Sequence, residues 1–136
     1  AINRAILGKI VFPDTERRKQ LEAILHPRVQ AVENEFIEKN RVLGTKVVAL
    51  DIPLLFETGG EKRCDITVVA SAPACVQRWR VMRRPGMTKE KFDAILKNQM
   101  PDKEKRQRAT FVVATGFGKS HSFRQVKKIM KAITHA

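Results

Sequence analysis

Aromatic side chains are scarce in this chain of 136 residues, which has no Tyr, one Trp and seven Phe. Most of the Phe occupy core-like positions in the apolar pattern, so few rings remain for stacking on bases. This scarcity argues against a nucleic-acid-binding module. The net charge of +13 keeps that alternative open, as do the unopposed basic residues near the end of the sequence, Lys119, Arg124, Lys127, Lys128 and Lys131.

Cysteines and long apolar runs are also rare. Cys64 and Cys75 form no metal-type pattern with the three histidines, so we expect reduced thiols in the cytoplasm. The sequence contains no run of 18 apolar residues and no signal peptide. We therefore expect a cytoplasmic protein with no membrane partner.

Acidic residues number 14 against 27 Lys and Arg, and the excess is uneven. Residues 73–108 hold eleven Lys and Arg against four Asp and Glu, a net charge of +7. The simplest interpretation of this stretch is a solvated basic surface with no specific function. The alternative is a lid over a triphosphate, because arginines on such a lid reach the transferring phosphoryl group.

Three short apolar runs are typical of buried strands, Val47–Leu50, Ile66–Ala70 and Phe111–Ala114. They alternate with helical segments, which predicts βαβ units and a parallel sheet. The fold class is therefore α/β, and three strands behind a helical opening amount to half of a doubly wound fold. Asp51 directly follows the first run, at the edge of the sheet where open α/β folds bind ligands.

Helical spacing dominates residues 1–44 and the last part of the sequence. Asp14 is a plausible N-cap, and the pair His26-Pro27 predicts a break between two helices. The final helix carries an apolar stripe that should pack on the sheet, formed by Val126, Ile129, Met130 and Ile133.

Five segments in a fixed order give this sequence a resemblance to a known family. They are Ile2–Phe12, Leu25-His26-Pro27, the Thr45–Glu57 segment TKVVALDIPLLFE, Gln77-x-x-Arg80-x-x-x-Arg84, and the stretch from Arg84-Pro85-Gly86 to Gln99-Met100-Pro101-Asp102. In this order they resemble dephospho-coenzyme A kinase, a P-loop kinase. The resemblance implies a partial P-loop NTPase-type three-layer fold, with a coenzyme A-binding helical region at 1–45, a nucleotide-binding core at 46–72 and 109–136, and a lid at 73–108.

The implied reaction is the ATP-dependent phosphorylation of the ribose 3′-hydroxyl of dephospho-coenzyme A, the last step of coenzyme A synthesis. The implied catalytic and ATP-binding arginines are Arg80 and Arg84. Helical spacing puts both on one face with Gln77, and we expect Val76 and Trp79 on the opposite, packed side. By the same resemblance, Thr115 and Gly116 contact the adenine side of ATP. Arg78 and Arg83 should face solvent.

On the substrate side the resemblance implies roles for His26, Arg28 and Glu57. His26 would position the dephospho-coenzyme A ribose or adenine, although a His before Pro is more often a helix cap or a packed residue. The Arg that the family usually has shortly after His-Pro is Gln30 here. Glu57 is expected to fix its loop or to contact substrate.

Asp51 is the candidate ligand for Mg²⁺, held directly or through water. The sequence contains no G-x-x-x-x-G-K-[ST], the loop whose amides and Lys hold the β- and γ-phosphates. We therefore expect an N-terminally truncated, inactive fragment that lacks this loop and the family's catalytic carboxylate, or a non-catalytic remnant paired with another chain. Gly116–Ser120 imitates the loop with the wrong spacing, so we interpret it as a strand-to-helix turn. Thr110 and Ala114 depart from the family's polar positions.

Overall fold

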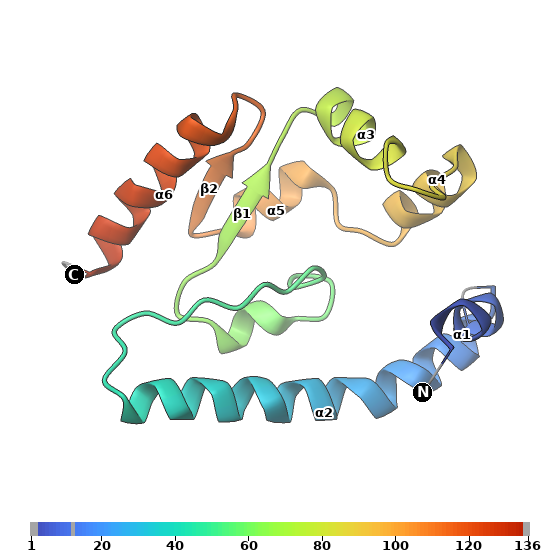
Figure 1. Cartoon of the computed structure of the whole chain (residues 1–136), viewed down its shortest axis with the longest axis horizontal. Coiled ribbons are helices and arrows are strands. Elements are labelled where there is room, and N and C mark those ends of the chain that lie inside the picture. The colour runs from blue at the N-terminus through green and yellow to red at the C-terminus, as the bar shows by residue number, and fades with distance from the viewer. Residues whose placement is uncertain (1–2, 12, 135–136) are drawn as a thin grey trace. The chain divides into compact units, whose positions relative to one another are not determined.

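The computed structural model describes residues 3–11 and 13–134. The chain divides into two compact units, Ala1–Leu50 and Asp51–Ala136. Helices alone make up the regular structure described in the first unit, whereas the second combines helices with a small sheet (Figure 1). Each unit is considered by itself below.

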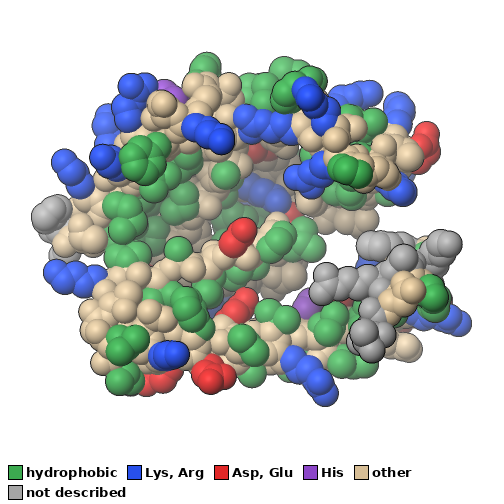
Figure 2. Space-filling view, viewed as in Figure 1, with side chains coloured by type: hydrophobic (Ala, Val, Ile, Leu, Met, Phe, Trp, Pro, Cys, Tyr) green, Lys and Arg blue, Asp and Glu red, His purple; other side chains and the backbone are tan. Residues whose placement is uncertain are grey.

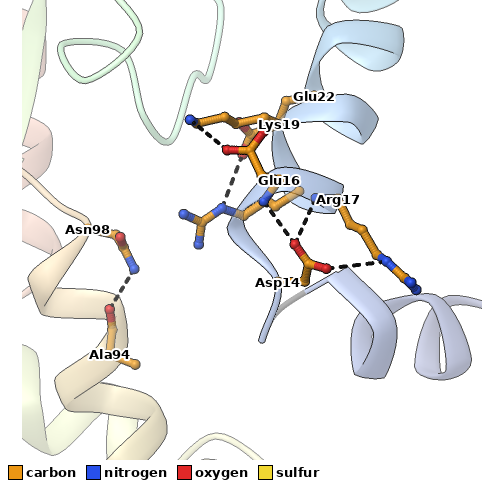
Figure 3. A network of polar contacts seen from close by, with 8 residues as sticks. Asp14, Glu16, Arg17, Lys19, Glu22, Ala94 and Asn98 are labelled. Carbon is orange, nitrogen blue, oxygen red and sulfur yellow. Dashed lines mark hydrogen bonds and ion pairs between the residues drawn. The ribbon is translucent and has the colours of Figure 1, made fainter.

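Two helices form the first unit, α1 (Arg4–Val11) and α2 (Thr15–Val42). Asp14 begins α2 as predicted: its Oδ1 accepts from the backbone N–H groups of Glu16 at 2.9 Å and Arg17 at 3.1 Å. The Arg17 Nε also lies 3.3 Å from Asp14 Oδ2 (Figure 3). Because the first N–H groups of a helix have no partner within it, this carboxylate fixes where α2 starts.

The predicted helix break at His26-Pro27 is wrong, because α2 runs through it with Pro27 inside the helix. Proline has no N–H, so Pro27 cannot bond to the carbonyl of Ala23, four residues earlier. That loss removes one hydrogen bond from a helix of 28 residues, and the turns on either side continue the ladder. His26 is consequently an exposed residue within the helix and not a cap.

Apolar side chains on α2 are uncovered within its own unit, and Figure 2 shows hydrophobic side chains at the surface over this helix. No residue of α2 is buried. The exposed fractions of the large ones range from 37% for Ile37 to 77% for Val42, and the set also includes Ile24, Leu25, Val29, Val32 and Phe36. The apolar periodicity read from the sequence is thus real, but it does not form a core within this unit.

The predicted strand Val47–Leu50 is not formed, and these residues have no regular structure. A strand exists through hydrogen bonds to a neighbouring strand, and within residues 3–11 and 13–134 the only strand pairing is between two other segments. Apolar, β-branched composition made Val47 and Val48 look like a strand. Composition alone does not supply the partner.

The second unit contains a two-stranded parallel sheet, which confirms the α/β class and the parallel pairing. β1 (Val68–Ser71) pairs with β2 (Phe111–Ala114) so that Val68 lies opposite Phe111 and Ser71 opposite Ala114. The 3-10 turn η1 (Gly60–Arg63) precedes β1. Three helices lie between the strands, α3 (Ala74–Met82), α4 (Lys89–Lys97) and α5 (Asp102–Arg108), and α6 (Lys119–Thr134) follows β2. β1 begins two residues later than the run Ile66–Ala70 predicted.

The core of this unit is small and lies around the sheet. Phe56, Val69, Phe92 and Val113 are its buried apolar residues. α6 packs against β2, as its apolar stripe predicted, and α5 packs against β1 (Figure 1). None of the helices described in this structure is both long and apolar enough to cross a bilayer.

Several aromatic residues are more exposed than predicted. Trp79 was expected on the packed side of α3 but is 59% exposed, with the Arg83 guanidinium 4.6 Å from its ring centroid. Phe117 and Phe123 are 74% and 61% exposed, so they do not occupy core positions. The helices that carry Trp79 and Phe123 present those faces to solvent, because a short two-stranded sheet covers few side chains.

Candidate functional site

The carboxyl ends of β1 and β2 meet at the pair Ser71 and Ala114. Thr115 extends this pairing by one residue, since its N–H donates to the Ser71 carbonyl at 2.7 Å and its hydroxyl donates to the same oxygen at 3.0 Å. The carboxyl edge of a parallel sheet is where open α/β folds bind ligands. Thr115 is therefore fixed at the carboxyl edge of the sheet, and by the resemblance described above it is expected to contact a nucleotide.

Arg80 reaches this edge from α3. Its Nη1 donates to Thr115 Oγ1 at 3.1 Å and its Nη2 donates to the Thr115 carbonyl at 2.7 Å. The structure thus brings together two of the predicted site residues, from the predicted lid and from the predicted core. A guanidinium has five N–H donors, so this contact orients the group and leaves donors for an anion.

Gly116 to Gly118 form the turn between β2 and α6, as predicted for this glycine-containing segment. Gly118 has a φ of +89°, a backbone conformation that favours glycine. At Gly116 a Cβ atom would lie 3.0 Å from Pro73 Cδ, which is tighter than nine in ten real Cβ contacts, so glycine favours this close approach of the two chain segments. The turn therefore depends on the backbone conformation of Gly118 and on the close packing of Gly116 against Pro73, the residue that precedes α3.

An open pocket of about 720 Å³ lies beside this turn. Its lining comes from α3, the turn and the first half of α6: Arg80, Thr115, Gly118, Lys119, Ser120, Ser122, Phe123 and Val126. Two cationic side chains, and the N-terminus of a 16-residue helix, favour a negatively charged ligand here. The apolar side chains of Phe123 and Val126 supply a surface for a flat, weakly polar group.

Glu57 is fixed in place on another part of the unit. Its Oε1 accepts from the Met100 N–H at 2.8 Å and from Lys105 Nζ at 2.8 Å, and both charged side chains are largely buried. Burial pushes the pKa of Glu57 upward, but the hydrogen bonds from Lys105 and from the Met100 N–H outweigh it and hold the pKa below its usual value. Glu57 therefore fixes its own loop, one of the two roles predicted for it.

A second ion pair runs beside the first. Arg108, one turn after Lys105 on α5, pairs with Glu61 on η1. The Arg108 guanidinium also lies 5.2 Å from the centroid of the Phe56 ring. Residues 56–61 are thereby held against α5, which is itself packed on β1.

Asp51 is exposed at the start of the second unit. Among the residues that the structure describes, no group of three or more His, Cys, Asp or Glu could hold a metal ion. Mg²⁺ is commonly bound by one or two carboxylates together with substrate phosphates and water. A single exposed Asp51 fits that mode of binding and does not fit an all-protein metal site.

The structure does not bring the remaining predicted site residues to the contact between Arg80 and Thr115. His26 and Arg28 are exposed on α2 in the first unit, whereas Glu57, Arg80 and Thr115 belong to the second. Arg84 was expected to share a helical face with Gln77 and Arg80, which is wrong because α3 ends at Met82. The turn that follows redirects the chain, and Arg84 is exposed.

The departures at Thr110 and Ala114 are accommodated by hydrogen bonds. Thr110 and Thr67 exchange two bonds, each hydroxyl accepting from the other residue's N–H, at 3.1 and 3.0 Å. The side-chain amide of Gln125 bonds to both backbone groups of Ala114, accepting from its N–H at 3.0 Å and donating to its carbonyl at 3.1 Å. These contacts align the two strands and join β2 to α6.

Sequence reasoning did not assign Asp102 and Lys105 to the site region. Asp102 ends the quoted motif Gln99-Met100-Pro101-Asp102 and begins α5, so the signal was present in the sequence. Its partner Ser71 is far away along the chain, at the end of β1. Only the fold brings them together.

Comparison with known proteins identifies a family. The family model for dephospho-CoA kinase matches residues 1–118. Among curated proteins, the dephospho-CoA kinase of Bartonella quintana is 48% identical over 130 residues, covering 96% of this chain and 67% of that protein. The one from Mesorhizobium japonicum is 53% identical over 117 residues, covering 86% of this chain and 59% of that protein.

Solved structures agree with this result. A structure titled "Crystal structure of TT1252 from Thermus thermophilus" superposes with a TM-score of 0.79 at 36% identity, covering 96% of this chain and 66% of that one. Dephospho-CoA kinase from Campylobacter jejuni gives a TM-score of 0.61 at 29% identity, covering 97% of this chain and 65% of that one. The chain therefore spans about half to two thirds of the length of the relatives it matches.

Proposed function

The chain belongs to the dephospho-CoA kinase family, and we propose that it takes part in the ATP-dependent phosphorylation of the ribose 3′-hydroxyl of dephospho-coenzyme A. The observation that carries this proposal is the contact between Arg80 and Thr115. It holds an arginine at the carboxyl edge of a parallel sheet, beside an open pocket that is lined by Lys119 and the start of α6.

In this reaction the protein mainly positions the substrates and neutralises charge, since phosphoryl transfer needs little covalent chemistry from side chains. Arg80 is the residue that stabilises negative charge on the transferring group, through the N–H donors that Thr115 leaves free. Lys119 and the first N–H groups of α6 add positive potential along the same pocket. Thr115 and Gly116 border the adenine, and Phe123 offers its ring to the base.

Mg²⁺ would be held by Asp51 and by phosphate oxygens, and when bound the ion supplies further charge neutralisation. Glu57 acts indirectly, by fixing the loop that follows Asp51 to α5. His26 and Arg28 bind dephospho-coenzyme A from α2. Arg84 assists Arg80 at longer range, from the exposed turn after α3.

The proposed partners are small molecules, ATP and dephospho-coenzyme A, and the proposed location is the cytoplasm. Family membership does not favour the alternative of a nucleic-acid-binding module. The sequence contains no G-x-x-x-x-G-K-[ST], so we propose that the β- and γ-phosphates need a loop that these 136 residues do not supply.

A fusion tests this function. The chain would be joined behind a phosphate-loop segment from a dephospho-CoA kinase, and ADP formation would be followed with Mg-ATP. We expect turnover that depends on dephospho-coenzyme A and stops when coenzyme A replaces it, because the 3′-hydroxyl is then already phosphorylated. A folded fusion with no substrate-dependent ADP formation would overturn the proposal.

A further inference from the structure

Asp102 connects three elements at the carboxyl edge of the sheet. From the first turn of α5, its Oδ2 accepts from the Ser71 hydroxyl at 2.8 Å. Its Oδ1 accepts from Gln77 Nε2 on α3 at 3.4 Å. Both carboxylate oxygens are therefore engaged, with the end of β1 and with the helix that carries Arg80.

One route from Asp102 to Arg80 passes through the end of β1. The Ser71 side chain is held by Asp102, while the Ser71 carbonyl accepts from the N–H and the hydroxyl of Thr115. Thr115 in turn accepts both hydrogen bonds from Arg80. Ser71 is only 8% exposed, so water does not readily replace these partners.

The other route passes along α3. Gln77 precedes Arg80 by three residues, which puts both on one helical face. The Gln77 amide also donates to the Ala72 carbonyl at 2.7 Å, before the helix begins. Asp102 and Ala72 together fix the rotation of α3 relative to the end of β1.

We propose that Asp102 is a positioning residue for Arg80, a role that rests on the proposed kinase function. A free arginine side chain has much rotamer entropy, and holding its guanidinium in one orientation before the substrate binds lowers the cost of reaching the transition state. Asp102 supplies this by fixing both Ser71 and Gln77. It touches neither ATP nor substrate and acts through these two residues.

The Arg80 guanidinium itself gives the first test, in the 136-residue chain without any activity assay. Rotation about the Cζ–Nε bond is slowed when both Nη groups are hydrogen bonded, so the Arg80 Nη groups should give separate NMR resonances, assigned with Arg80→Lys. Asp102→Ala should merge or broaden them, and Asp102→Asn, which keeps the shape and one acceptor, should have an intermediate effect. Asp93→Asn is the matched control, because Asp93 pairs with Lys89 on α4, 3.0 Å away.

Kinetics of the fusion enzyme give the second test. Asp102→Ala should lower kcat about tenfold with little change in KM for dephospho-coenzyme A, since small misplacements of a catalytic group reduce rate more than binding. Asp93→Asn should leave both unchanged. Unaltered Nη resonances in Asp102→Ala or in the well-folded Asp102→Asn would overturn the positioning role, even in an active kinase. An inactive parent fusion would instead overturn the proposed kinase function. The resonances would then still show that Asp102 orients Arg80, but that orientation would serve no catalysis.

Discussion

Arg80 and Thr115 are joined by two hydrogen bonds, from the guanidinium to the threonine hydroxyl and to its carbonyl oxygen. The contact connects α3 with the end of β2, two segments separated by α4 and α5 in the chain. Because the carbonyl belongs to the backbone, substitution of the threonine side chain would leave one of the two bonds. Orientation of Arg80 is thus partly a property of the sheet edge and not only of its neighbours' side chains.

Arg80→Ala in the fusion enzyme should lower kcat by roughly 10²-fold, because charge stabilisation of a transferring phosphoryl group is commonly worth about 3 kcal/mol. Arg84→Ala should do less, since Arg84 lies beyond the end of α3. Arg78→Ala is the control, on a different side of the same helix, and should change almost nothing. Steady-state kinetics with thermal melts would decide this, and equal small effects at all three positions would make the segment a solvated basic surface.

Glu57→Gln should destabilise the second unit at neutral pH by about 1–3 kcal/mol, because it removes a charged acceptor from Lys105 and from the Met100 N–H. The pKa of Glu57 is depressed in the folded protein, so its contribution to stability is fully present above the unfolded pKa, near 4.3. That contribution is lost as the pH falls through the lower folded pKa. The free energies of unfolding of the two proteins should therefore converge between about pH 5 and about pH 2.

Glu38→Gln is the matched control for this pH dependence. The Glu38 pKa is also lowered, by its hydrogen bond from Arg41, but the pair is exposed on α2. Water and salt screen such a pair. Urea titrations should therefore show that Glu38→Gln changes the free energy of unfolding, and its pH dependence, much less than Glu57→Gln does. A constant difference between Glu57→Gln and the parent protein at all pH values would contradict the role assigned to the Glu57 charge.

Gly116→Ala should destabilise the second unit by about 1–3 kcal/mol, the usual cost of overpacking. The new methyl group would lie 3.0 Å from Pro73 Cδ, which is tighter than nine in ten real Cβ contacts, so the proline ring or the turn would have to shift. Without this clash, Ala would stabilise by restricting the unfolded chain, so the sign of the effect tests the close approach. Pro73→Ala in the same protein should restore most of the loss, as measured by thermal melts.

Asp14→Ala should destabilise the start of α2 by about 1 kcal/mol, because the Glu16 and Arg17 N–H groups lose their acceptor. Amide hydrogen exchange at these two residues should accelerate, while the middle of the helix stays unchanged. Asp14→Asn keeps an acceptor oxygen and should exchange nearly as slowly as the parent. Faster exchange in both variants would mean that charge, not the hydrogen bond, is what matters.

Local patterns in the sequence were sufficient to predict many of the structural elements of this molecule. The cap at Asp14, the strand at Phe111–Ala114, the turn at Gly116–Gly118 and the apolar stripe of α6 all depend on residues close together in the chain. Their physics is local: capping, β-branched composition, glycine conformation and helical periodicity. The family could be identified from motif order for the same reason, since each motif is short.

Only the tertiary structure decided the remaining features. Val47–Leu50 has the composition of a strand but pairs with no other strand in the part of the chain that the structure describes, and Pro27 remains inside a helix that its neighbours continue. The assembly of Ser71, Gln77, Asp102 and Thr115 around Arg80 depends on parallel pairing that brings two strand ends together. Hydrogen bonds between distant residues leave no periodic signal in the sequence, because what they require is a position in space that the whole fold creates.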